Sequence, residues 1–217
     1  MDIPLHPEML AAARREHGFP KRLLRAFRQL WSPELYGLQW GDPDVVTPLK
    51  FIKERYLLPY VSPDQAAVEI GPGGGRWTRY LRSFKVVYAV DYSQAMLEEL
   101  KRNFGRCRNI RFIKNNGTDF PGIPERSIDY LFSFGTFVQF DLDVIEAYLV
   151  SIKSIMKPAA NIVIQYSDKT KIMSQLLEGS SENTPEMMRG AVQAQGYRIL
   201  EEDTTSLWNS SVIRFTI

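Results

Sequence analysis

The sequence is poor in the residues that build covalent or metal-held scaffolds. It has one cysteine, Cys107, and two histidines, His6 and His17, among 217 residues. A single cysteine excludes an internal disulfide and a cysteine-based metal cluster, and it is typical of a reducing compartment. Because both histidines lie near the N-terminus, a histidine base is not indicated elsewhere. We expect a cytoplasmic protein without a bound metal.

Long apolar runs and a dominant charge are also missing. The 27 basic and 25 acidic residues leave a net charge of +2, which gives no overall field for a nucleic acid or an anionic membrane. Residues 1–10 lack the charged-then-apolar layout of a signal peptide, and no apolar run is long enough to cross a bilayer. The sequence therefore predicts no membrane span and makes a nucleic-acid partner unlikely.

Residues 1–65 differ in character from the rest. Between Arg14 and Arg28 lie six basic residues and one acid, Glu16, and an aromatic, turn-rich stretch follows. Three interpretations stay open for the basic run: a solvated helix face with an ordered tail, a cap over the active site, or a surface for an acidic partner. We expect an N-terminal helical cap segment over residues 1–65. The residues expected to help close the ligand pocket are Trp31, Trp40 and Asp42.

From Ala66 onward, short β-branched runs alternate with helix-like segments, which is typical of an α/β fold with a largely parallel sheet. Strands are predicted at 66–70, 86–90, 110–113, 128–134, 161–166, 197–203 and 211–217. Only residues 204–210 join the last two strands, so we expect a hairpin and an antiparallel last strand. The prediction is a doubly wound, seven-stranded, mostly parallel sheet that spans 66–217 as one domain.

Apolar residues at helical spacing fill the segments between these strands. One such face consists of Trp77, Tyr80, Leu81 and Phe84, and another of Ile145, Leu149, Ile152 and Met156, which ends before Pro158. Ser93 is expected to cap the helix that contains Leu97, and Thr184 to cap one that opens with Pro185. Between these elements, residues 167–183 are expected to form a functional loop or lid.

The stretch "VEIGPGGGRWT", from Val68, places one acid, Glu69, and three alternating glycines at a strand-to-helix junction. The glycines are Gly71, Gly73 and Gly75. Glycine there lets backbone N–H groups approach a ligand. A dinucleotide fingerprint would need glycine where Arg76 stands, and no Gly-Lys-Ser/Thr of a P-loop follows. An acid beside the loop instead favours a ligand with a positive end.

Asp91 adds a second acid, at the end of the second predicted strand. A carboxylate at this place can accept hydrogen bonds from both hydroxyls of a ribose. A nucleoside with an amino-acid or sulfonium tail therefore satisfies both acids.

The run from Ala66 to Ser167 resembles a class I S-adenosylmethionine-dependent methyltransferase. "VEIGPGGGRWT" is similar to the first motif of that family, "YAVDYSQAML" to the second, and "NGTDFPGIPERSIDYLFSFGTFVQFD" to the third and fourth. "ENTPEMMRGAVQAQGYRIL" resembles the family's last helix and strand. The resemblance implies a Rossmann-like fold, S-adenosylmethionine as cofactor and S-adenosylhomocysteine as product.

The resemblance also implies a role for each matching residue. It places the methionine part of the cofactor on the three glycines, with Glu69 supporting the loop, and the ribose hydroxyls on Asp91. Around the adenine it places Tyr92, Met96, Thr118, Asp119 and Phe120. Near the transferred methyl group it places Ser133 and Phe134.

The residues after the predicted fourth and fifth strands bear on the acceptor. Gln139 stands where many relatives carry histidine, so the base candidates that remain are Asp141, Tyr166 and Asp168. A helix cap and a loop turn are alternative roles for the two aspartates. A metal held by these aspartates would lack further ligands.

Motifs for nucleic-acid bases are missing. "SFGTF" replaces the Asn/Asp-Pro-Pro-aromatic motif of amino methylation, and Cys107 lies far from the position of a cytosine nucleophile. We expect methylation of a small-molecule hydroxyl, such as that of a sugar, a glycan or a natural product. The alternatives are RNA or tRNA methylation that uses the basic N-terminal segment, and a non-catalytic scaffold.

Overall fold

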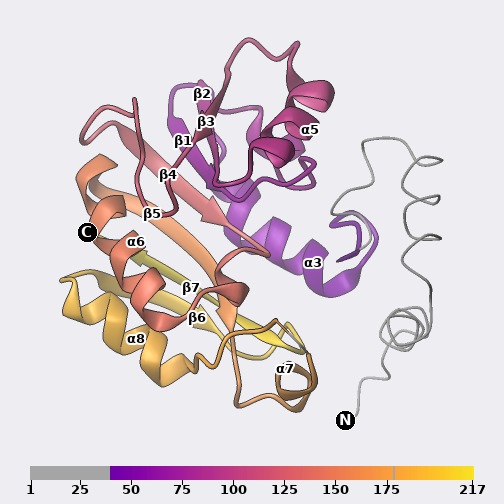
Figure 1. Cartoon of the computed structure of the whole chain (residues 1–217), viewed down its shortest axis with the longest axis vertical. Coiled ribbons are helices and arrows are strands. Elements are labelled where there is room, and N and C mark those ends of the chain that lie inside the picture. Colours follow the sequence, from indigo (N-terminus) through magenta and orange to yellow (C-terminus); the bar gives the residue numbers. More distant parts are fainter. Residues whose placement is uncertain (1–39, 178) are drawn as a thin grey trace.

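The computed structural model describes residues 40–177 and 179–217, which form one seven-stranded sheet (Figure 1). The strand order is β3-β2-β1-β4-β5-β7-β6. The strands are β1 Ala66–Ile70, β2 Val86–Asp91, β3 Ile110–Lys114, β4 Ile128–Ser133, β5 Met156–Ser167, β6 Arg198–Asp203 and β7 Ser210–Thr216. Neighbouring strands are parallel from β3 to β5, and β7 runs antiparallel to both β5 and β6. The predicted doubly wound sheet with an antiparallel last strand is confirmed.

Helices cover both faces of the sheet (Figure 1). They are α3 Thr47–Ile52, α4 Thr78–Leu81, α5 Gln94–Phe104, α6 Leu142–Ile155, α7 Ile172–Leu176 and α8 Pro185–Ala194, with short turns η3 Lys53–Leu57, η4 Leu58–Tyr60 and η5 Phe137–Gln139. Helices α6 and α8 pack on one face, and α3, α4 and α5 on the other. Side chains of β1 alternate between the two faces: Val68 packs on the face covered by α6 and α8, and Ala67 on the face covered by α3, α4 and α5.

Two predicted elements differ from the structure. The helix after β1 spans only Thr78–Leu81, although Trp77 and Phe84 are buried as the pattern indicated. Strand β5 begins directly after α6, at Met156, and contains Pro158. Because proline has no N–H for the ladder, pairing with β4 is interrupted here, and Ala159 adopts a positive φ of 60°.

The caps predicted for two helices are confirmed. The Ser93 hydroxyl accepts a hydrogen bond from the Met96 N–H at the start of α5, and the Thr184 hydroxyl accepts one from Met187 at the start of α8. Both side chains satisfy N–H groups that lack partners inside the helix.

Residues 40–65 pack on the same core as the strands. Leu49 and Ile52 of α3, with Tyr56 and Leu57 of η3, are buried against the face that also carries α4 and α5. The Tyr130 hydroxyl of β4 donates to the Tyr56 carbonyl. Of the cap segment predicted for residues 1–65, residues 1–39, Trp31 included, lie outside the described residues.

The strand order reverses between β1 and β4, and in open α/β sheets the ligand crevice lies at the carboxyl ends of two such strands. The loops after these two strands touch. A Cβ atom on Gly71 would lie 1.8 Å from Oγ1 of Thr136, and one on Gly75 would lie 2.1 Å from the Phe104 ring. Gly71 also has a φ of +69°. These glycines are therefore required by neighbouring protein atoms as well as by backbone conformation.

We predict that Gly71→Ala lowers the free energy of unfolding by about 2–4 kcal/mol, because it adds backbone strain and a clash with Thr136. Gly122→Ala is the matched control, since Gly122 has a φ of +77° but nothing within 4 Å of an added Cβ. The control should cost only about 1 kcal/mol, from strain alone. Urea denaturation followed by circular dichroism measures both, and equal losses would contradict the steric role of Thr136.

Candidate functional site

Glu69 is a buried acid at the carboxyl end of β1. Its side chain is 2% exposed, and one oxygen accepts a hydrogen bond of 2.5 Å from the Thr78 hydroxyl. Burial raises the pKa of Glu69 to about 8 against the hydrogen bond from Thr78, with a smaller upward contribution from the charge of Asp91. The site therefore disfavours an isolated negative charge at Glu69 and favours one that is compensated by a positive ligand.

Asp91 joins the glycine loop to the end of β2. Its Oδ1 accepts a hydrogen bond of 2.8 Å from the Ser93 N–H, and the Gly73 N–H also donates to the carboxylate. Burial raises the pKa of Asp91, and the two backbone donors and Lys114 oppose this shift. The carboxylate is half-buried, so it keeps an open side at the edge of the crevice.

The residues that the resemblance places around the adenine have different surroundings. Tyr92 is 66% exposed, with the Lys114 ammonium 4.4 Å from its ring centre, and Met96 is half-buried. Asp119 and Thr118 are both half-buried. Phe120 is buried, with its ring edge-on to that of Tyr148.

The adenine-reading loop predicted from residues 118–120 is held by its own turn. The Asp119 carboxylate accepts from the Asn116 N–H at 2.8 Å, and the Asn116 side chain accepts from the Thr118 N–H. Asn115 donates to the Asp119 carbonyl and to the Tyr148 hydroxyl. One Asp119 oxygen is thus used by the protein, while Phe120 contributes its surface chiefly to the core.

At the mouth of β4, Ser133 and Phe134 are both buried. The Ser133 hydroxyl donates to the Ile70 carbonyl at 3.0 Å, which ties β4 to β1. The Phe134 ring lies 4.7 Å from that of Trp77, and the Arg76 guanidinium lies 5.6 Å from the Phe134 ring centre. The two residues therefore form the floor of the crevice.

The three base candidates are separated by their contacts. The Tyr166 hydroxyl donates to Glu202 at 2.5 Å, and burial raises its pKa, so this group holds its proton. Asp168 is fully buried and accepts from the Thr170 N–H, the Thr170 hydroxyl and the Ser211 hydroxyl. Both residues are therefore structural supports, and we assign no proton transfer to them.

Asp141 occupies a different setting. It is exposed at the N-cap position of α6, where its side chain makes no capping hydrogen bond. It follows η5 in the loop after β4, so among the three candidates it has the most accessible carboxylate.

Two further residues were predicted to help close the ligand pocket, and their surroundings differ. Trp40 is 62% exposed. Asp42 pairs with Arg79 of α4 and accepts from the Asp44 N–H. Asp42 thus fixes the chain before α3 to α4.

Sequence reasoning missed three residues of the crevice: Arg76, Thr136 and Gln165. Gln165 of β5 is buried, accepts from the Gly135 N–H at 2.6 Å and donates to the Ser210 hydroxyl at 2.7 Å. It therefore joins the loop after β4 to β7. No local pattern signals these contacts, although the position of Arg76 directly after the glycine loop was a usable indication.

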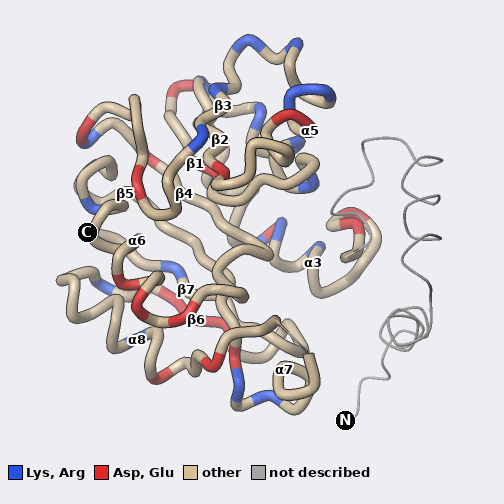
Figure 2. Tube along the Cα trace, viewed as in Figure 1, with Lys and Arg blue, Asp and Glu red and all other residues tan. Residues whose placement is uncertain are grey.

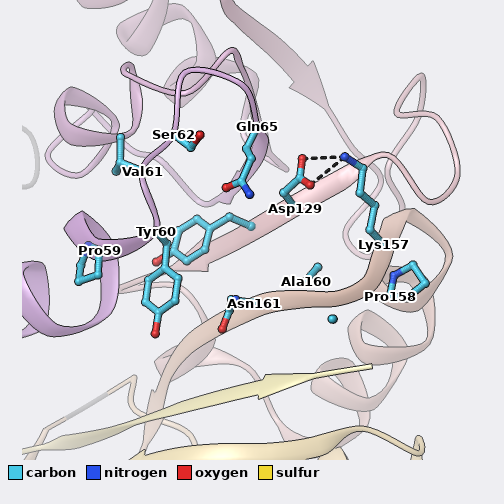
Figure 3. A pocket seen from close by; sticks show the side chains of 12 residues that line it. Pro59, Tyr60, Val61, Ser62, Gln65, Asp129, Lys157, Pro158, Ala160 and Asn161 are labelled. Atoms are coloured by element: carbon cyan, nitrogen blue, oxygen red, sulfur yellow. Dashed lines mark hydrogen bonds and ion pairs between the residues drawn. The ribbon is translucent and has the colours of Figure 1, made fainter.

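A hollow of about 470 Å³ lies at the opposite, amino-terminal end of the sheet (Figure 3). Its charged pair and one amide are already partnered: Asp129 pairs with Lys157 at 2.8 Å, and Asn161 accepts from Arg214 at 2.9 Å. We therefore place the functional site at the carboxyl ends of the strands.

Within the described part of the chain, no group of three or more His, Cys, Asp or Glu side chains is placed to hold a metal ion. In the same part, no helix has the length and apolar character needed to cross a bilayer.

Comparison with known proteins agrees with this geometry. A family described as methyltransferase domain matches residues 67–159. An S-adenosylmethionine-dependent methyltransferase from Clostridium acetobutylicum superposes with a TM-score of 0.65 at 14% identity, covering 77% of this chain and 89% of that chain. One from Mesorhizobium loti gives 0.65 at 14%, covering 80% and 99%. The family model and these folds support a class I S-adenosylmethionine-dependent methyltransferase domain in this chain.

A third structure, of mitomycin 7-O-methyltransferase, has a TM-score of 0.57 at 16% identity and covers 83% of this chain and 59% of that one. No curated protein sequence matches the chain. At these identities the solved structures support the methyltransferase fold and leave the acceptor open.

The acidic residues at the carboxyl ends of β1 and β2 fit S-adenosylmethionine in charge. S-adenosylmethionine carries a sulfonium and an ammonium, which suit the buried Glu69, and a ribose, which suits the half-buried Asp91. Gly71, Gly73 and Gly75 all have a positive φ, which favours glycine, and they put no side chain on the loop between these acids.

We predict that Asp168→Ala lowers the free energy of unfolding by about 2–4 kcal/mol, because it leaves the buried Ser211 hydroxyl and the Thr170 donors without their acceptor. Asp141→Ala is the matched control and should cost less than about 1 kcal/mol, since its carboxylate makes no capping bond. Chemical denaturation of both variants at neutral pH measures the two free energies of unfolding. A similar loss of stability in both would contradict the structural role assigned to Asp168.

The raised pKa of Glu69 predicts a pH-dependent stability. Between its usual value of 4.5 and about 8, the unfolded chain loses the Glu69 proton while the folded chain keeps it, so the free energy of unfolding falls as pH rises through this window. Glu69→Gln removes this slope. The variant should gain on the order of 3 kcal/mol relative to wild type between pH 4.5 and pH 8.5.

Urea midpoints measured across this range test the prediction, with the exposed Glu98→Gln as the control for removal of one carboxylate. Parallel profiles for wild type and Glu69→Gln would show that Glu69 is ionised in the folded protein at neutral pH.

Proposed function

We propose that the domain, assigned to residues 66–217, transfers a methyl group to a hydroxyl oxygen of a small molecule, such as a sugar, a glycan or a natural product. The observation that carries the proposal is the attachment of the insert 167–183 to the loop after β4, which puts extra chain beside the carboxyl ends of β4 and β5. The insert 167–183, which includes α7, lies beyond the end of β5 (Figure 1). Extra chain beside the site in this way favours a compact acceptor.

The insert is joined to the loop after β4 by hydrogen bonds. The Ser181 N–H donates to the Val138 carbonyl at 2.9 Å, and the Asn183 amide donates to the Phe140 carbonyl at 2.8 Å. The two loops therefore act as one wall. On α7, Ile172 and Leu176 are one helical turn apart and are 73% and 71% exposed. Such an apolar surface favours an acceptor with apolar parts.

When it is bound, S-adenosylmethionine supplies an electrophilic methyl group on a positively charged sulfur. The protein's own contribution is alignment and a route for the acceptor proton. Glu69 compensates positive charge, Asp91 orients the ribose, and the floor of Ser133 and Phe134 excludes water from the crevice. We assign removal of the hydroxyl proton to Asp141, whose carboxylate is exposed in the loop after β4.

A second candidate, RNA methylation, is favoured by one observation. The end of α5 and the segment into β3 carry exposed basic side chains and no acid (Figure 2). They are Lys101, Arg102, Arg106, Arg108 and Arg111. The basic run from Arg14 to Arg28, which lies outside the described residues, adds positive charge of the kind that an RNA partner needs.

We predict that tritium from methyl-labelled S-adenosylmethionine appears in the small-molecule fraction of a cell extract that is incubated with the protein. Asp91→Ala should abolish the transfer, because it weakens cofactor binding by about 100-fold through the loss of two charge-assisted hydrogen bonds. Calorimetric titration with S-adenosylhomocysteine checks that affinity, and the exposed Asp64→Ala is the control.

Label that appears only in RNA would support the second candidate and refute the first, and label only in protein would refute both. Failure of the wild type to bind S-adenosylhomocysteine would favour a non-catalytic scaffold.

A further inference from the structure

Positive charge gathers where α5 ends and where β2 and β3 begin (Figure 2). Residues 100–118 contain six of the chain's 27 basic residues and none of its 25 acidic ones. The turn before β2 adds two more exposed cations. We call the exposed cations at this end of the sheet the basic edge, which consists of Arg82, Lys85, Arg102, Arg106, Arg108 and Arg111.

The two loops that carry most of the basic edge are joined by Asn109. Its side-chain amide donates to the carbonyls of Arg82 and Phe84, both at 2.8 Å. In the second loop, the Arg111 guanidinium donates to the Arg108 carbonyl at 2.6 Å. The cations of both loops therefore belong to one surface.

The charge of this surface is not neutralised by the part of the protein that the structure describes. No cation of the basic edge forms an ion pair with a described residue. By contrast, Lys157 pairs with Asp129, and Arg189 pairs with Glu202. The excess of positive charge is thus local, since the whole chain has a net charge of only +2.

Local structure explains only some of these cations. Arg102 lies in the last turn of α5, where a positive charge is stabilised by the helix dipole. Arg111 lies on the edge strand β3, and charged side chains on such a strand oppose pairing with another chain. Lys85, Arg106 and Arg108 lie in loops and have neither role. Their mutual repulsion is relieved when an anionic partner binds.

The chemistry of the basic edge fits a chain of phosphates. Within residues 81–115, Tyr92 is the one large apolar side chain that is exposed, and it follows β2 at the other end of the strand. A protein interface has an apolar or aromatic centre, whereas nucleic-acid binding can depend on contacts between cations and phosphates alone. All cations of the basic edge except Lys85 are arginines, whose planar forks suit phosphate oxygens. We propose that the basic edge binds the phosphate backbone of RNA.

This binding is separate from methyl transfer. Glu69 and Asp91 stand at the carboxyl ends of β1 and β2, whereas the basic edge lies at the amino ends of β2 and β3. RNA phosphates and the cofactor would therefore occupy opposite ends of the sheet. The inference goes beyond either candidate acceptor, because a protein that methylates a small molecule can also be held on RNA in this way.

Fluorescence anisotropy of a labelled oligouridylate of about 16 nucleotides tests the proposal over a series of KCl concentrations. The logarithm of the wild-type affinity should fall with the logarithm of the salt concentration with a slope of about −3, since each phosphate contact on a single strand contributes about −0.7. Arg106→Gln combined with Arg108→Gln should weaken binding about 10-fold and make the slope shallower by about 1.4.

A matched control removes two exposed arginines from other parts of the sheet, Arg126 before β4 and Arg198 on β6. Arg126→Gln combined with Arg198→Gln should change the affinity by less than about 2-fold and leave the slope unaltered. Equal losses in the two double variants would overturn the proposal, because binding would then follow net charge. Wild-type binding that neither double variant weakens would also overturn it, since the RNA would lie elsewhere.

Other partners are tested with the wild type. Failure to bind the oligouridylate at low salt would overturn the proposal. Tighter binding to vesicles of phosphatidylserine and phosphatidylcholine would assign the surface to a membrane instead, and equally strong competition by polyglutamate would assign it to an acidic protein.

Calorimetric titration with S-adenosylhomocysteine separates the two sites. Both double variants should keep the wild-type affinity for this ligand, and a joint loss of RNA and S-adenosylhomocysteine in the Arg106 and Arg108 variant would contradict separate sites. Failure of the wild type to bind S-adenosylhomocysteine while it binds RNA would count against the proposed function alone.

Discussion

The close contact between the loops that follow β1 and β4 is the constraint on which the site depends. Thr136 occupies the space where a side chain on Gly71 would lie, and Ser133 donates to the carbonyl of Ile70. These contacts hold the two loops together at the point where the winding of the sheet reverses. Glu69, Arg76 and Phe134 take their positions from this contact, since each lies on or beside one of the two loops.

Most of the fold follows from local sequence. Strands such as β1 and β2 are apolar runs between turn residues, and Ser93 and Thr184 cap their helices through neighbours three residues away. The start of β5 could not be predicted from local sequence, because a proline such as Pro158 usually lies outside regular helices and strands. The structure instead keeps Pro158 in a strand whose pairing is interrupted, which depends on the neighbouring strand and on no local pattern.

The candidate site likewise contains residues that local sequence predicts and residues whose roles depend on distant parts of the chain. Glu69, the glycines and Asp91 could be predicted because they stand at the ends of predicted strands. The roles of Tyr166 and Asp168 could not, because their partners Glu202 and Ser211 lie 36 and 43 residues away. A polar side chain at the end of a strand looks the same in sequence whether it faces a ligand or a distant strand. Only the fold shows that these two are already satisfied by the protein.

The insert after β5 is attached to the rest of the protein largely through main-chain acceptors. Lys171 donates to the carbonyls of Leu207 and Ser210, Asn183 to that of Phe140, and the N–H of Ser181 to that of Val138. Carbonyls are present whatever side chain a residue carries, so substitutions in the loops that receive these bonds leave the attachment intact. The proposed acceptor wall can thus diverge in sequence while the cofactor end stays fixed, which would give one scaffold the freedom to acquire new substrates.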